Sequence, residues 1–218
     1  MKTRNIITTL FLLFIGTIYT NCNAQDATKN PARFGFKAGI NFSNLYTNNV
    51  DSNDLLVGFN GGLFAKLPIT SFFAIQPEIY FTTKGSRVAY KNTFVNGVAL
   101  FNLNYIEIPV LAVINVSKNF NVHFGPYISY LIDGKVKNDS KASIFDFENN
   151  VKPDDYNRID AGLAAGLGVD FGAFGLGLRY NYGLTTVGKE RTFLGTTTYT
   201  FPDAKNSVLS LYASFSLN

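Results

Sequence analysis

Alternation of apolar and polar residues is the feature that most constrains the fold of this 218-residue chain. From Arg33 to Ser43, Phe34 and every second residue after it are apolar, while the residues between them are Gly, Lys, Asn or Ser. Side chains alternate across a β-strand, so the pattern predicts a strand with one apolar face and one small or polar face. The pattern recurs in eight segments, at residues 33–43, 55–66, 72–84, 102–114, 119–131, 158–171, 173–184 and 206–217.

Eight such segments predict an all-β chain that crosses a membrane. Each is near or above the roughly 9–11 residues that a tilted spanning strand needs, and eight is the smallest even strand number of bacterial membrane barrels. No segment after the N-terminal region has 18 consecutive apolar residues, so a closed barrel is the structure that satisfies its backbone in a membrane. We therefore expect an eight-stranded antiparallel up-and-down transmembrane β-barrel, with short periplasmic turns, long extracellular loops and both termini in the periplasm. The expected short connections are 67–71, 115–118 and 172, and the long ones are 44–54, 85–101, 132–157 and 185–205.

The composition of the two faces indicates which one lies outside. A soluble barrel of the lipocalin type would have the opposite orientation, with its apolar face inside. Here the polar face carries 11 of the 19 glycines, as the narrow interior of an eight-stranded barrel favours. The apolar face carries large Phe, Leu and Ile side chains and no charged residue in the strand cores, which favours contact with lipid.

The alternation has local exceptions. Pro109 and Pro126 fall inside predicted strands, where proline is typical of a bulge. Four apolar side chains fall on the polar face: Leu56, Phe64, Leu103 and Leu111.

The N-terminal region has the three parts of a secretory signal peptide. Lys2 and Arg4 precede an apolar stretch of about 14 residues, too short for a membrane anchor, and a small-residue site ends at Ala24. We expect residues 1–24 to be the signal peptide, 25–32 a short periplasmic segment and 33–218 the barrel domain. Cys22 is either removed with the signal or retained as the acylated residue of a lipoprotein.

Seven charged residues lie on the predicted inner face, although an eight-stranded lumen has little room for unpaired charges. Three are positive and four are negative. We predict a structural network of ion pairs that fills the lumen, joined by Tyr105, Tyr127 and Tyr212; the alternative is a charged path for ions. The seven are Lys37, Lys66, Glu78, Glu107, Asp160, Asp170 and Arg179.

Little in the chain indicates catalysis. The only histidine, His123, lies six residues from Ser129 and so about 20 Å from it along one strand. Glu78 and Glu107 could form a carboxylate pair, but nearby cations favour ion pairs instead. We expect no catalytic residues, no metal site and no cofactor. Without Lys2 and Arg4 the chain has 17 positive and 15 negative residues, so we expect no nucleic-acid partner.

The predicted 132–157 loop contains three apolar residues, Ile144, Phe145 and Phe147. On a long exposed loop such residues mark a candidate partner surface; they could equally fold onto the barrel rim.

Five segments resemble the PorT-like outer-membrane β-barrel family. They are RFGFKAGINFSNL at 33–45, GFNGGLFA at 58–65, QPEIYFTTKG at 76–85, YIEIPVL at 105–111 and GPY at 125–127. The resemblance implies an eight-stranded barrel in the outer membrane of a diderm bacterium. The family's namesake belongs to a system that secretes proteins across the outer membrane. The chain departs from the usual barrel ending, because its last residue is Asn218 and not an aromatic residue.

These observations lead to one functional expectation and two alternatives. We expect a non-enzymatic structural or interaction module in outer-membrane lipid, accessory to protein secretion or surface assembly. The alternatives are a narrow pore for small solutes and a lipid-active barrel enzyme.

Overall fold

The computed structural model describes residues 31–46, 53–91, 96–140, 147–150, 156–188, 190–193, 196–199 and 204–217. All of its strands lie in the compact unit Ala32–Asn218. The expected signal peptide and residues 25–30 lie outside the described residues. Among those that are described, no helix is long and apolar enough to cross a membrane.

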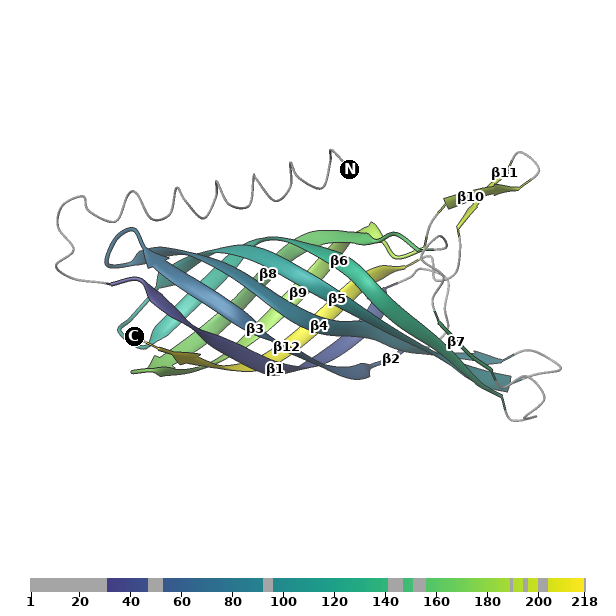
Figure 1. The fold of residues 1–218 in the computed structure, drawn as a ribbon, viewed down its shortest axis with the longest axis horizontal. Helices are drawn as coiled ribbons and strands as arrows, with labels where there is room; N and C mark the ends of the chain where they lie inside the picture. The colour runs from purple at the N-terminus through teal and green to yellow at the C-terminus, as the bar shows by residue number, and fades with distance from the viewer. Residues whose placement is uncertain are drawn as a thin grey trace, which may run out of the picture. The chain divides into compact units, whose positions relative to one another are not determined.

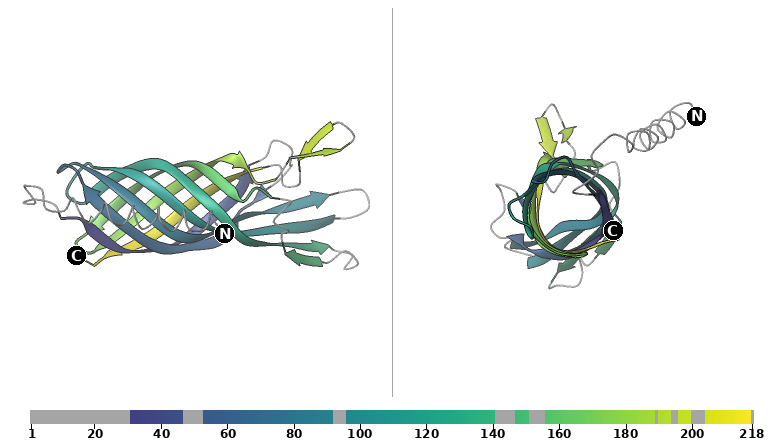
Figure 2. Two further views of the ribbon diagram at one scale, coloured as in Figure 1. Left: turned by 45° about the horizontal axis from the view of Figure 1, so that its top comes forward. Right: turned by 90° about the vertical axis from the view of Figure 1, so that its left-hand side faces the viewer.

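Eight long antiparallel strands form a closed barrel, as the alternation predicted. Each pairs with its neighbours along the chain, and the first strand pairs with the last, which closes the ring. The view along the barrel axis shows this ring directly (Figure 2, right). The strands are β1 (Arg33–Tyr46), β3 (Leu56–Pro68), β4 (Phe73–Lys91), β5 (Asn96–Asn115), β6 (Phe120–Ser140), β8 (Ile159–Phe171), β9 (Phe174–Thr186) and β12 (Lys205–Ser216).

The predicted long loops contain more regular structure than expected. β4 and β5 stay paired as far as Lys91 and Asn96, and β6 continues to Ser140. The ends of these strands project beyond the barrel as a sheet, together with β7 (Phe147–Asn150), which pairs with β6 (Figure 1). We call this sheet the rim extension; it comprises residues 85–91, 96–102, 132–140 and 147–150. The predicted long connections at 85–101 and 132–157 therefore overlap strands at 85–91, 96–101, 132–140 and 147–150, because backbone pairing continues where the apolar alternation fades.

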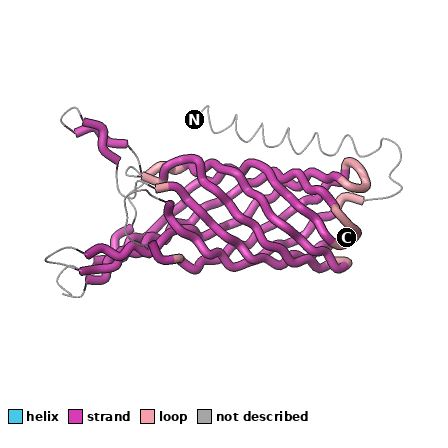
Figure 3. Tube along the Cα trace, turned by 180° about the vertical axis from the view of Figure 1, so that it is seen from behind, coloured by secondary structure: helices cyan, strands magenta, loops and turns pink. Residues whose placement is uncertain are grey.

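Four short strands complete the loop end. β2 (Asn53–Asp54) pairs with β4, and β7 (Phe147–Asn150) pairs with β6. β10 (Glu190–Phe193) and β11 (Thr196–Tyr199) form a separate two-stranded sheet. In the trace coloured by secondary structure, the described part of the chain is almost entirely strand (Figure 3).

The opposite end of the barrel has three short turns, close to their predicted positions. They lie at 69–72, 116–119 and 172–173. In the first, the backbone N–H groups of Ile69 and Thr70 both donate to the carbonyl of Phe73. In the last, Gly172 has a φ of 62°, a left-handed conformation that glycine adopts without a steric penalty.

The two prolines do not form the predicted bulges. Pro109 pairs with Tyr127, and Pro126 pairs with Leu163, and the register does not change at either proline. Each proline removes only one backbone donor from the ladder, because it lacks the N–H group but keeps its carbonyl. The register of β5 and β6 shifts instead beside Asn104 and leaves Ile132 as the extra residue.

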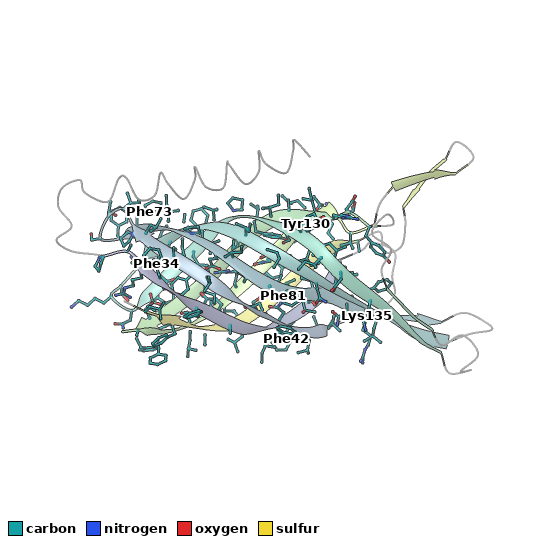
Figure 4. All side chains as sticks on the ribbon, in the orientation of Figure 1. Phe34, Phe42, Phe73, Phe81, Tyr130 and Lys135 are labelled. Carbon is teal, nitrogen blue, oxygen red and sulfur yellow. The ribbon has the colours of Figure 1, made fainter. Side chains whose placement is uncertain are left out.

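The outer surface of the barrel is apolar and exposed in the isolated chain. Phe174 and Val57 are both 65% exposed, and large apolar side chains cover every barrel strand. Phe34, Phe73, Phe81 and Tyr130 show their distribution along the barrel (Figure 4). A surface of this size and composition requires lipid to cover it.

Replacing Leu178 by Arg tests this orientation. Leu178 is 42% exposed at the middle of β9, and an arginine there would lie near the bilayer midplane. We expect a loss of about 2–4 kcal/mol in the free energy of unfolding in lipid vesicles, measured by urea titration. Leu184→Arg, near the loop end of the same face, should cost only about 0–1 kcal/mol. Equal losses for the two variants would contradict the orientation.

Candidate functional site

The lumen of the barrel is filled by polar and charged side chains. These come from all eight barrel strands and are mostly buried. Glycines on the same face leave room for rings from the neighbouring strand. A Cβ at Gly162 would lie 2.6 Å from Tyr127 Cε1, and one at Gly177 would collide with the ring of Tyr212. Glycine therefore allows large polar side chains to lie across a narrow interior.

One ion-pair cluster lies toward the short-turn end and is centred on Glu78. This carboxylate accepts hydrogen bonds from both terminal nitrogens of Arg179, at 2.7 and 2.9 Å, and from Gln76 at 2.6 Å. Lys37 forms an ion pair with it from β1. The bidentate geometry joins strands β4 and β9 directly across the lumen.

A second pair lies closer to the short-turn mouth. Lys66 Nζ is 3.1 Å from Asp170 Oδ2, which also accepts a hydrogen bond from Asn121 at 3.2 Å. Asn121 Oδ1 lies 3.3 Å from His123 Nδ1, and Arg179 donates to His123 Nε2 at 3.4 Å. Because Nε2 accepts a hydrogen bond, His123 is neutral with its proton on Nδ1.

The third cluster lies toward the loop end and is centred on Lys84. Its ammonium forms ion pairs with Glu107 and with Asp160, the latter at 2.8 Å. Glu107 also accepts a hydrogen bond from Ser129 at 2.9 Å. Tyr80 and Asn181 donate to the same carboxylate. A buried carboxylate with this many donors needs no water.

Tyrosine rings surround the buried ammonium groups. Lys84 Nζ lies 5.1 Å from the ring centre of Tyr105 and 4.6 Å from that of Tyr127. Lys37 Nζ lies 4.3 Å from the ring centre of Tyr212. These distances suit cation–π attraction, which is strongest where water is excluded.

A layer of neutral hydrogen bonds lies on the wall between β1, β3 and β12. Asn41 donates to Thr82 Oγ1 at 2.8 Å and accepts from Asn60 and Ser210 at 2.6 and 2.7 Å. This amide connects four strands.

Apolar residues close the lumen at the loop end. Leu103, which breaks the alternation in sequence, is fully buried here beside Phe101 and Tyr105. The exception at Leu111 belongs to a second buried group with Ala74 and Val113. We call the first group the apolar cap; its members are Leu45, Phe101, Leu103, Tyr105, Leu131, Tyr156, Val187 and Ala204.

All seven charged residues proposed from the sequence form ion pairs in the structure. Glu78 and Glu107 each have their own cation, so they form no acid pair. One member was missed: Lys84, which occupies an inner position of β4 like Glu78 six residues before it. The parity of the strand was the signal that could have identified it. With Lys84, the lumen residues that these ion pairs join are four positive and four negative.

The other expected features fall partly outside the described residues. Ile144 and Phe145 lie outside them, and Phe147 is the first residue of β7. His123 and Ser129 have separate partners, as the hydrogen bonds above show. In the part of the chain that the structure describes, no three His, Cys, Asp or Glu side chains gather as a metal site would require.

Comparison with known families assigns the chain to a class. Residues 23–188 match the outer membrane protein β-barrel domain. The chain belongs to this family. It is thus an outer-membrane β-barrel of a diderm bacterium, whereas the PorT-like subgroup is not identified by this match. The comparison with curated proteins gave no match.

Solved structures of small outer-membrane barrels resemble this family member. Neisserial surface protein A aligns over 86% of this chain and 100% of its own, with 15% identity and a TM-score of 0.51. Ail, the attachment invasion locus protein of Yersinia pestis, has the same coverage with 14% identity and a TM-score of 0.45. At this identity the similarity to neisserial surface protein A concerns the fold alone.

Replacing Lys84 by Met tests the loop-end cluster. The change leaves two buried carboxylates without their shared cation, and breaking a buried ion pair this way costs about 3–5 kcal/mol. We expect a loss of that size in the free energy of unfolding, measured by urea titration in lipid vesicles.

The double variant Lys84→Met with Glu107→Gln removes one of the two charges left behind and should recover part of the loss. Lys118→Met, at an exposed turn, should change stability by about 0.5 kcal/mol or less. A Lys84→Met loss as small as that of the control would show that the cluster contributes no stability.

Proposed function

We propose that this barrel is a non-enzymatic structural or interaction module of the outer membrane, accessory to protein secretion or surface assembly. Its short turns and both termini face the periplasm, and its rim extension faces outward and contacts a partner. The observation that supports this proposal is the combination of a filled lumen with strands that continue beyond the barrel.

The filled lumen argues against transport through the barrel. Ion pairs cross it between β1, β4 and β9, and again between β4, β5 and β8. The apolar cap then closes the loop end with side chains that are 8% exposed or less. A solute would have to break several buried pairs, each of which is costly to open.

The rim extension supports the interaction role. It is a paired sheet of β4, β5, β6 and β7, so its backbone is held by regular hydrogen bonds and presents a defined surface. Arg87, Asn102 and Lys135 are exposed on its outer side. Figure 4 shows Lys135 pointing away from the barrel. Pre-ordered surfaces of this kind lose little conformational entropy on binding.

The orientation follows the usual order of outer-membrane barrels. Such barrels have short turns on the periplasmic side and longer loops outside. An even number of strands brings the first and last strand ends to the short-turn side. The resemblance to the PorT-like family supports an accessory role in secretion.

Site-specific photo-crosslinking in cells tests the interaction role. A benzoylphenylalanine at Lys135 or Arg87 should trap a defined partner protein, identified by mass spectrometry after outer-membrane extraction. The same probe at Lys118, an exposed residue of the 116–119 turn, should not trap that partner. A barrel that forms no specific adduct from the rim extension would contradict the proposal.

Conductance in planar lipid bilayers tests the filled lumen. We expect the purified barrel to produce no steady open steps under conditions in which a 16-stranded porin conducts, because its interior holds side chains in place of water. Steady single-channel steps would overturn the filled-lumen proposal and favour a narrow solute pore.

A further inference from the structure

A small cavity lies inside the barrel at the short-turn end. Three cations line it, Arg33, Lys37 and Lys66, together with the carboxylate of Asp170 and the hydroxyls of Ser214 and Ser216. Its volume is about 30 Å³, enough for one or two particles the size of water. The cavity is therefore too small for an organic solute.

The charges around this cavity do not balance. Among the residues that the structure describes, two carboxylates, Glu78 and Asp170, face four cations on the inner face of this half of the barrel, and His123 adds no charge because it is neutral. The positive surplus is two. The loop-end half has the opposite imbalance, since Lys84 alone serves Glu107 and Asp160. The four cations are Arg33, Lys37, Lys66 and Arg179.

Two of these cations also lie opposite each other on neighbouring strands, which adds local repulsion to the excess of positive charge. Arg33 on β1 and Lys66 on β3 are direct partners in the antiparallel register, a position in which like charges destabilise a sheet. Lys66 has Asp170 as its counter-charge. Among the described residues, Arg33 forms no ion pair. A surplus of charge in a half-buried site is costly unless an opposite charge is supplied.

We propose that this cavity binds one small inorganic anion, such as chloride, between Arg33 and Lys66. The anion offsets the repulsion between the two strands and stabilises the mouth of the barrel. The serine hydroxyls at the cavity wall are suitable additional donors to an anion. The proposal is independent of the interaction role of the rim extension.

Bromide locates the site directly. Crystals of the full-length mature barrel grown or soaked in sodium bromide should show an anomalous peak in the cavity beside Arg33 and Lys66. Bromide peaks confined to other surfaces would overturn the proposal.

Anion exchange measures the effect on stability. Urea unfolding in neutral phosphatidylcholine vesicles would be compared in sodium chloride and in sodium gluconate of the same ionic strength, because gluconate is too large for the cavity. At about 0.2 M chloride the unfolding equilibrium constant should fall about tenfold relative to gluconate, as mass action requires for a dissociation constant of about 20 mM. Identical unfolding in the two salts would contradict binding.

Two variants with the same change of charge distinguish anion binding in this cavity from a general effect of salt on stability. Arg33→Gln removes the guanidinium that lines the cavity and should reduce the chloride effect at least threefold while the barrel still folds. Lys118→Gln removes a cation from an exposed turn at the same end and should leave the chloride effect unchanged. If Arg33→Gln retained the full effect, or Lys118→Gln lost it, the assignment to this cavity would be wrong.

Discussion

The hydrogen bonds between β1 and β12 are the interaction on which the rest of the structure depends. Twelve residue pairs join these strands, from Gly35 with Ser216 to Tyr46 with Lys205. Within a bilayer an open sheet edge would leave a row of backbone groups without partners, so the sheet must close. Closure in turn places one face of every strand against lipid and encloses the other in a lumen of fixed width.

That narrow lumen explains the composition of the inner face. Eight strands leave space for side chains but no aqueous channel, so polar groups there must satisfy one another. Glycines such as Gly162 give space to Tyr127, and Glu78 gathers Lys37, Arg179 and Gln76 from three strands.

Sequence periodicity predicted the strands and the inner face well, because a period of two is a direct consequence of strand geometry. The partners in each ion pair could not be predicted, since Glu78 and Arg179 lie 101 residues apart and meet only through the register of the closed barrel. The rim extension was missed because its residues lack the apolar alternation that lipid imposes. Lys84 is predictable from the sequence, because it shares the strand parity that places Glu78 in the lumen.

The continuity of β4, β5 and β6 from the lumen into the rim extension also has a mechanical consequence. A pull on the tip of the extension acts along these strands, at right angles to the hydrogen bonds of their antiparallel ladders. All bonds of a ladder then share the load together, whereas a sideways pull would open them one after another. The ladders of the rim extension therefore resist a pull along the strands far better than a pull that separates the strands sideways.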